Sequence, residues 1–436
     1  MTPWFADSHT SVYAGRLEDV LPSLGEASVD SVVCDPPYEL GFMGKSWDAS
    51  GVAYQPGTWG HVLRVLKPGG HLLAFGGTRT YHRMAVAVED AGFEVRDTIA
   101  WMYGSGFPKS LDVSKAIDKA AGAEREVVGE YAAPDGKSRG PMASFSVNGM
   151  HRWGDQWYSF DELPANAQEY VRGAGRSDGD SIRAVTAPAT HSAKQWEGWG
   201  TALKPAHEPI VVARKPFAGT VAVNVLEHGT GALNIDGCRI SARAGDYDHP
   251  GNDNRTERRA IYGADERNGR QVEPHASGRW PANVVLDPEA AAALDRQSGT
   301  LPSRPSFIGS GSGKTSAESG TSDWPIGGKV TVGYHDTGGA SRFFYCAKAS
   351  KADRGAGNSH PTVKPVELMR WLVRLVTPPD GTVLDPFAGS GTTLVAAVLE
   401  GVNVIGCEMT DEYLPLIDGR VAWAREQVAN QQPTLL

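Results

Sequence analysis

Two short motifs near opposite ends of the 436-residue chain carry residue types suited to chemistry. The first is Asp35-Pro36-Pro37-Tyr38, in which two prolines remove two backbone donors and stiffen the turn. What remains is a fixed array of acceptors, made of the Asp35 carboxylate and backbone carbonyls, beside the flat ring of Tyr38. Such an array suits an exocyclic amino group, and the ring can stack on a planar base.

The second motif is a Gly-rich turn, DPFAGSGTT, at 385–393. Gly389 and Gly391 permit a tight turn and close approach of the backbone to a ligand. The turn lacks the GxGxxG phosphate fingerprint, and Glu408 follows Gly389 by 19 residues. An acid at that spacing can grip two ribose hydroxyls. We therefore expect a nucleoside ligand without a pyrophosphate.

The segments that must position these motifs alternate between strand and helix patterns. Near the first motif, 28–34 and 71–77 predict buried strands, with a helix predicted over 58–70 between them. Near the second motif, 366–376 predicts a helix and 402–408 a strand. This order is typical of a parallel α/β sheet. One α/β domain is therefore split between the two ends of the chain, and we expect both motifs to meet along one rim of its sheet.

Composition excludes several classes of protein. The formal net charge of −9 excludes a uniformly basic DNA coat, but leaves room for a local basic face. No stretch approaches the roughly 18 apolar residues of a membrane helix. The four cysteines form no CxxC pair, which argues against a disulfide framework or a cysteine-based metal site. These features favour a cytoplasmic protein without a metal.

The two motifs, in this order, resemble those of the N-4/N-6 amino-methyltransferases of DNA, and of the permuted β class in particular. HPTVKP at 360–365 resembles a further cofactor-binding motif of that family. The resemblance covers the regions 10–120 and 340–425. It implies a Rossmann-like, circularly permuted fold with a mostly parallel seven-stranded sheet. It also implies methyl transfer from S-adenosylmethionine (SAM) to adenine N6 or cytosine N4 in double-stranded DNA.

The resemblance implies roles for individual residues. Asp35 and the Pro36 carbonyl, within a tetrapeptide that Pro37 completes, would bind the target amino group, and Tyr38 would stack on the flipped base. Glu408 would hold the ribose hydroxyls of SAM. The residues that would surround SAM are Thr362, Lys364, Asp385, Phe387, Gly389, Ser390, Gly391, Thr392 and Glu408. Within this set, Thr362 and Lys364 would lie near the SAM carboxylate.

The resemblance also suggests a division of the chain. The expected parts are a catalytic half at 1–102, an insertion at 103–207, a returning strand at 208–216, a second insertion at 217–345 and a SAM-binding half at 346–436. The two polar insertions are expected to form a target-recognition region. The candidate DNA contacts are Arg255, Arg258, Arg259 and Arg270, which lie among acidic residues, so a solvated loop is the alternative. Phe107 is a candidate for lining the base pocket, or else a loop anchor. Relatives of this class often form homodimers, and the sequence does not reveal a cognate nuclease.

Several readings of the function stay open. Adenine is favoured as the target because cytosine-N4 relatives usually carry Ser before Pro-Pro, where this chain has Asp35. Cytosine-N4 methylation is the alternative. A dinucleotide-dependent oxidoreductase would not explain the first motif. A DNA-binding protein with a dead methylase core would have a broken motif or lack Glu408, and both are intact.

Overall fold

The fold places the two ends of the chain in one domain. The computed structural model describes residues 1–40, 46–106, 110–133, 145–147, 150–153, 156–159, 181–240, 277–302, 306–308, 329–331, 336–347, 358, 360 and 362–431. These residues form two compact units, Met1–Ser105 with Ala206–Leu436 (unit 1) and Gly106–Pro205 (unit 2).

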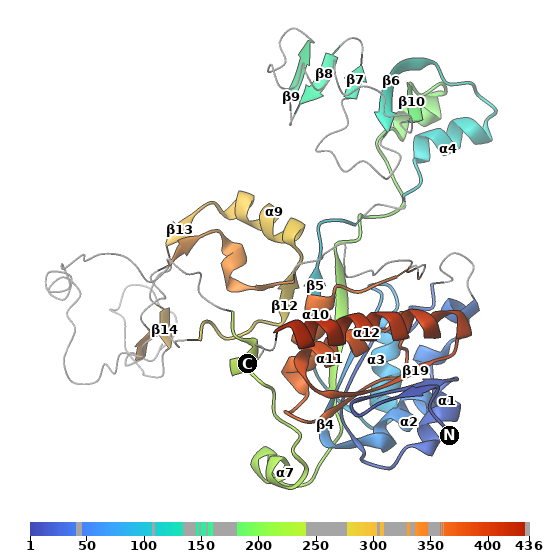
Figure 1. Cartoon of the computed structure of the whole chain (residues 1–436). Coiled ribbons are helices and arrows are strands. Elements are labelled where there is room, and N and C mark those ends of the chain that lie inside the picture. The colour runs from blue at the N-terminus through green and yellow to red at the C-terminus, as the bar shows by residue number, and fades with distance from the viewer. Residues whose placement is uncertain are drawn as a thin grey trace, which may run out of the picture. The chain divides into compact units, whose positions relative to one another are not determined.

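A ten-stranded sheet forms the centre of unit 1 (Figure 1). Its strands, in spatial order, are β1 (Phe5–Ala6), β2 (Thr10–Ala14), β19 (Asn403–Glu408), β18 (Thr382–Asp385), β3 (Val29–Cys34), β4 (Leu66–Phe75), β11 (His207–Arg214), β5 (Glu94–Met102), β12 (Val284–Leu286) and β17 (Tyr345–Cys346). Neighbouring strands are parallel except where β1 or β11 is one of the pair. The mostly parallel α/β fold is confirmed. Seven strands were expected, and three short strands extend the sheet to ten, β1 at one end and β12 followed by β17 at the other.

Helices cover both faces of this sheet. Those on one face are α1 (Leu17–Val20), α2 (Pro56–Val65) and α3 (Tyr81–Asp90), and those on the other are α10 (Val366–Val376), α11 (Thr392–Glu400) and α12 (Leu414–Gln431). Unit 1 also contains α7 (Val221–His228) and α9 (Pro288–Ser298). Adjacent strand residues face opposite layers, as Val32 and Val33 show. Val33 packs into one apolar cluster with residues of α10, α11 and α12, and Val32 packs into another with α1, α2 and α3. Each strand end is therefore fixed between two packed layers.

Some element bounds differ from the expectation. The helix expected over 58–70 ends at Val65, and β4 starts at Leu66, because Leu66 already pairs with Val29 of β3. Strand pairing thus overrides the Pro-Gly-Gly signal. The expected second insertion at 217–345 falls within the span of unit 1, where its described elements include α7, α9 and β12. Two small ladders pair β13 (Leu301–Pro302) with β16 (Thr337–Gly338), and β14 (Ser306–Ile308) with β15 (Lys329–Thr331).

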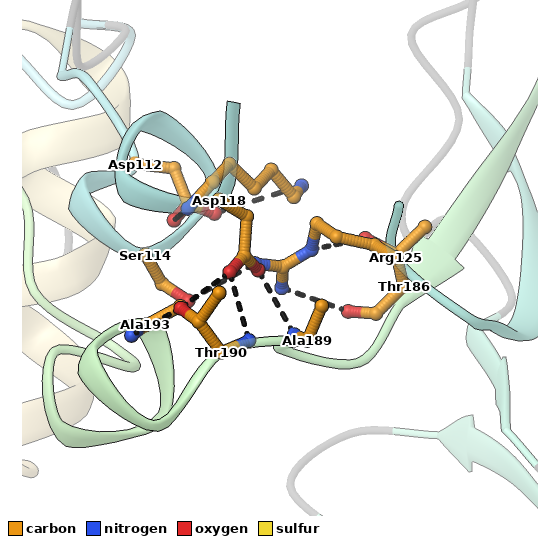
Figure 2. Close-up of polar contacts among 9 residues, drawn as sticks. Asp112, Ser114, Asp118, Arg125, Thr186, Ala189, Thr190 and Ala193 are labelled. Atoms are coloured by element: carbon orange, nitrogen blue, oxygen red, sulfur yellow. Dashed lines mark hydrogen bonds and ion pairs between the residues drawn. The ribbon is translucent and has the colours of Figure 1, made fainter. Parts of the chain in front are cut away.

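Unit 2 has its own antiparallel sheet, in the order β10 (Ser181–Thr186), β6 (Val127–Ala133), β7 (Phe145–Val147), β8 (Met150–Trp153) and β9 (Gln156–Ser159). Its helices are α4 (Val113–Ala120) and α6 (His191–Gln195). The buried Asp118 joins the two helices (Figure 2). Its carboxylate accepts hydrogen bonds from Thr190 Oγ1 at 2.7 Å and Arg125 Nη1 at 2.6 Å. Thr190 in turn caps the N-terminus of α6.

Within the described part of the chain, no helix is long and apolar enough to cross a membrane.

Candidate active site

The two motifs meet at one edge of the sheet. β3 pairs in parallel with β18 through Val32 and Leu384, and β18 pairs in parallel with β19. Because parallel strands end at the same edge, the tetrapeptide after β3, the Gly-rich turn after β18 and Glu408 at the end of β19 share one rim. The predicted meeting of two distant segments is confirmed. This rim is the candidate active site.

The tetrapeptide that starts at Asp35 is held in place by its surroundings. The backbone carbonyl of Tyr38 accepts hydrogen bonds from Thr80 Oγ1 at 2.9 Å and Tyr54 OH at 3.1 Å. Asp35 Oδ2 accepts a hydrogen bond from Lys364 Nζ at 2.7 Å. Asp35 Oδ1 is buried and has no hydrogen-bond partner among the described residues. A buried acceptor without a donor is costly, so this atom is suited to a donor that arrives with a ligand.

Lys364 lies on the tetrapeptide side of the rim. Its ammonium group is 2.7 Å from Asp35 Oδ2 and 3.2 Å from Glu208 Oε2. Burial alone would lower the pKa of Lys364, but the two carboxylates outweigh burial and raise it. Burial, followed by the charges of Asp35 and Glu208, raises the pKa of Tyr38 well above its usual value. Lys364 is therefore charged and Tyr38 neutral near pH 7.

The Gly-rich turn is tied to Glu408. The Gly389 N–H donates to Glu408 Oε2 at 2.7 Å, and the Thr410 N–H donates to Glu408 Oε1 at 2.7 Å. Gly389 and Gly391 have φ of +54° and +79°, which glycine adopts without strain. A Cβ on Gly389 would lie 3.2 Å from His360 Nε2, so His360 packs closely on the turn.

A buried arginine fixes the other side of this turn. Arg420 of α12 donates from Nη1 to the Ser390 carbonyl at 2.6 Å, to Ser390 Oγ at 2.9 Å and to Thr392 Oγ1 at 3.0 Å. Asp385 Oδ1 accepts a hydrogen bond from the Phe387 N–H at 3.0 Å. These contacts hold the turn in one shape, which a ligand can then meet without reorganising the backbone.

Acidic side chains are concentrated along the rim. Burial raises the pKa of Asp385 to about 7, the charges of Asp35 and Glu408 add to that rise, and hydrogen bonds from Thr393 and Phe387 oppose it. Burial likewise raises the pKa of Glu408, against hydrogen bonds from Thr410 and Gly389. Carboxyl groups whose pKa is raised in this way favour a cationic ligand, because its positive charge would stabilise their ionised forms.

Not every expected residue can be placed. Phe107, Arg255, Arg258, Arg259 and Arg270 lie outside the described residues. Thr362 is exposed, and its carbonyl lies 2.5 Å from His360 Nδ1. Glu208 and Arg420 were not predicted from the sequence. Glu208 does carry a signal, since it is an acid two residues before the apolar run 210–213 of strand β11.

The family comparison now bears on this rim. The family model described as DNA methylase matches residues 29–129 and 177–418, which is well over half of the chain. The chain belongs to the DNA methylase family. The match includes both motifs, Lys364, Glu208 and Glu408, so the whole rim lies within the family region.

Individual relatives match the chain over short segments. Type II methyltransferase M.ScaI of Streptomyces caespitosus is 37% identical over 75 residues, which are 17% of this chain and 24% of the relative. DNA adenine methyltransferase YhdJ of Escherichia coli is 41% identical over 58 residues, 13% of this chain and 20% of the relative. The chain thus spans about a quarter or less of the length of these relatives.

Solved structures resemble the chain along most of its length, but weakly. M1.HpyAVI is 13% identical, with 94% of this chain and 98% of that one covered and a TM-score of 0.37. The cytosine-N4-specific PvuII DNA methyltransferase is 14% identical, with 98% and 95% covered and a TM-score of 0.40. The family assignment rests on the family match and not on these likenesses.

Proposed function

We propose that this DNA methylase transfers a methyl group from SAM to the N6 amino group of an adenine flipped out of double-stranded DNA. The observation that carries the proposal is Asp35 Oδ1, a buried acceptor without a partner among the described residues, on the same rim as the Gly-rich turn. An aromatic amine is a poor nucleophile because its lone pair is delocalised into the ring. An acceptor placed at its N–H strengthens its hydrogen bond as the nitrogen becomes positive.

The rim offers hydrogen-bond acceptors and a negative charge that suit SAM. Glu408 offers carboxylate oxygens suited to ribose hydroxyls, and a Cβ on Gly389 would lie only 3.2 Å from His360 Nε2, so the turn packs closely there. Asp385, with Phe387, Ser390, Gly391, Thr392 and Thr362, would line the rest of the site. When bound, SAM supplies a methyl group on a positively charged sulfur. The raised pKa of Asp385 suits a ligand with positive charge.

On the base side, the chain's own residues bind and orient. Asp35 and the Pro36 carbonyl accept hydrogen bonds from the amino group, and the Tyr38 ring stacks on the base. The base cannot be reached inside a duplex, so its extrusion costs a few kcal/mol. Alignment of the amine with the methyl group then lowers the barrier. Unit 2 is a candidate for DNA contact because Trp196 and Trp199 are 41% and 60% exposed.

Adenine is preferred over cytosine because Asp35 precedes Pro-Pro. One relative is named an adenine methyltransferase, whereas one solved structure is a cytosine-N4 enzyme, so cytosine N4 is the second candidate. Mass spectrometry of nucleosides from the DNA of an expressing host distinguishes the two products. We expect N6-methyladenine. N4-methylcytosine alone would establish the second candidate, and the absence of both would contradict the proposed function.

A further inference from the structure

The Lys364 ammonium group, which binds Asp35, also contacts a second acid, Glu208. Glu208 Oε2 accepts a hydrogen bond from Tyr38 OH at 2.8 Å and lies 3.2 Å from Lys364 Nζ. Lys364 Nζ also donates to Tyr38 OH at 3.1 Å and to Asp35 Oδ2 at 2.7 Å. An ammonium group has three N–H donors, so these three partners account for all of them.

Aromatic rings confine the same ammonium group. Lys364 Nζ lies 5.2 Å from the centroid of the Tyr38 ring and 4.9 Å from that of the buried Phe75 ring. Both distances are within reach of a cation–π attraction. The ammonium therefore has little freedom to move as a whole, and a change in its partners would act mainly by redirecting its N–H groups.

We propose that Glu208 is a positioning residue for methyl transfer, because it occupies one Lys364 N–H and anchors the Tyr38 hydroxyl. The inference rests on the proposed function. Without the Glu208 carboxylate, the released N–H can turn to Asp35 Oδ1 and occupy the acceptor that the target amine needs. The Tyr38 ring would also lose its anchor and its fixed stacking orientation. Glu208 thus protects the open acceptor without touching the base.

The kinetic test compares Glu208→Ala, Glu208→Gln and Tyr38→Phe with Glu227→Gln as control. Glu227 is an exposed glutamate of α7, so its variant keeps the wild-type rate.

We expect Glu208→Ala to lower kcat about tenfold or more, with the Kd for SAM unchanged within about twofold. Glu208→Gln loses less, because an amide oxygen can still accept from Tyr38. Glu208→Ala lowers kcat by a smaller factor in the Tyr38→Phe variant than in the wild-type protein. A wild-type kcat for Glu208→Ala, or fully multiplicative losses, would overturn the inference.

A second readout needs no activity. The urea midpoints of Glu208→Ala, Tyr38→Phe and the double variant form a thermodynamic cycle for this contact. We expect the double variant to shift less than the sum of the single variants, and additive shifts would overturn the anchoring role. If the wild-type chain transfers no methyl group to DNA, the proposed function fails, while this cycle still decides whether Glu208 holds Tyr38.

Discussion

Each unit of the molecule buries an aspartate, and the two behave in opposite ways. In unit 1, burial raises the pKa of Asp385 to about 7. In unit 2, burial alone would raise the pKa of Asp118, but hydrogen bonds from Ala189, Thr190 and Arg125 lower it to about 2. Figure 2 shows these donors converging on the Asp118 carboxylate. Both side chains are almost fully inaccessible to solvent.

The difference separates a structural carboxylate from one suited to a ligand. Asp118 meets a guanidinium, two backbone N–H groups and a hydroxyl, so its charge is fully compensated by the fold. At the rim, Asp385 faces two further acids, and Asp35 keeps an open acceptor within the described residues. Such incomplete compensation is what a site for a cationic cofactor and an amine donor requires.

The largest effect is expected at the open acceptor. Asp35→Asn keeps the size of the side chain but removes the negative charge that would stabilise the developing positive charge on the amine. We expect methyl transfer to fall by about 10²–10³-fold or more. The assay measures tritiated methyl groups transferred from SAM to unmethylated DNA.

The matched control for Asp35→Asn is Asp19→Asn, at an exposed position of α1. It should keep the wild-type rate. Calorimetric titration should show that Asp35→Asn still binds SAM, because SAM is expected to bind mainly to the other motif. A variant that retained most of its rate would contradict the role of Asp35.

The second effect concerns stability. Asp118→Asn removes the charge that compensates the half-buried Arg125, whose Nη1 lies 2.6 Å away. We expect a lower thermal midpoint for unit 2 and an unchanged affinity for SAM. Asp112→Asn is the matched control, because Asp112 is an exposed N-cap of the same helix and asparagine caps equally well. Equal midpoints for the two variants would contradict the structural role of Asp118.

The pH dependence of unit 2 follows from the direction of the shift. The pKa of Asp118 is depressed in the folded state, so its stabilising contribution is present above the unfolded value of about 4. The contribution is lost as the pH falls through about 2. Between about pH 4 and pH 2, unit 2 should therefore lose less stability in Asp118→Asn than in the wild-type protein.

The contrast also shows what the sequence could predict. The rim was predictable because a strand followed by a turn and a helix places its turn at the carboxyl edge of a parallel sheet. The spacing from Gly389 to Glu408 is local, and it predicted an acid that shares a nucleoside site with the turn. In the structure, Glu408 lies beside that turn and accepts a 2.7 Å hydrogen bond from the Gly389 N–H. Glu208 meets Tyr38 across 170 residues, and no local pattern encodes that contact.

The placement of Lys364 illustrates the same limit. HPTVKP predicts that this segment closes the cofactor pocket, and His360 does pack on the Gly-rich turn. Four residues further on, the Lys364 ammonium group lies between two carboxylates. Asp35 follows the end of β3 and Glu208 lies at the start of β11, which runs antiparallel to β4, so both acids lie at the same edge of the sheet. Electrostatic partners brought together only by tertiary structure are not visible in a motif.

A smaller effect sharpens the meaning of the raised pKa of Asp385. A cationic cofactor binds the ionised carboxylate better, so the affinity for SAM should rise about tenfold between pH 6 and pH 8 as Asp385 ionises. The amino group of SAM titrates nearby, so the informative quantity is the difference between wild type and Asp385→Asn. The same pKa implies that Asp385 stabilises the free protein below about pH 4 and ceases to do so as the pH rises through about 7. Equal pH profiles in the two proteins would show that Asp385 does not sense the cofactor.

The smallest effect tests whether the shape of the turn matters apart from its charge. Arg420→Lys keeps the positive charge but cannot reproduce the contacts of one Nη1 with Ser390 and Thr392. The loss of a hydrogen bond or two predicts a Kd for SAM that is weaker by about three- to tenfold. Arg425→Lys, on the same helix but paired with Asp7, should leave the Kd unchanged. If both variants bind SAM like the wild type, the turn keeps its shape without Arg420, and the backbone of Gly389 and Gly391 together with Glu408 is sufficient to hold the cofactor.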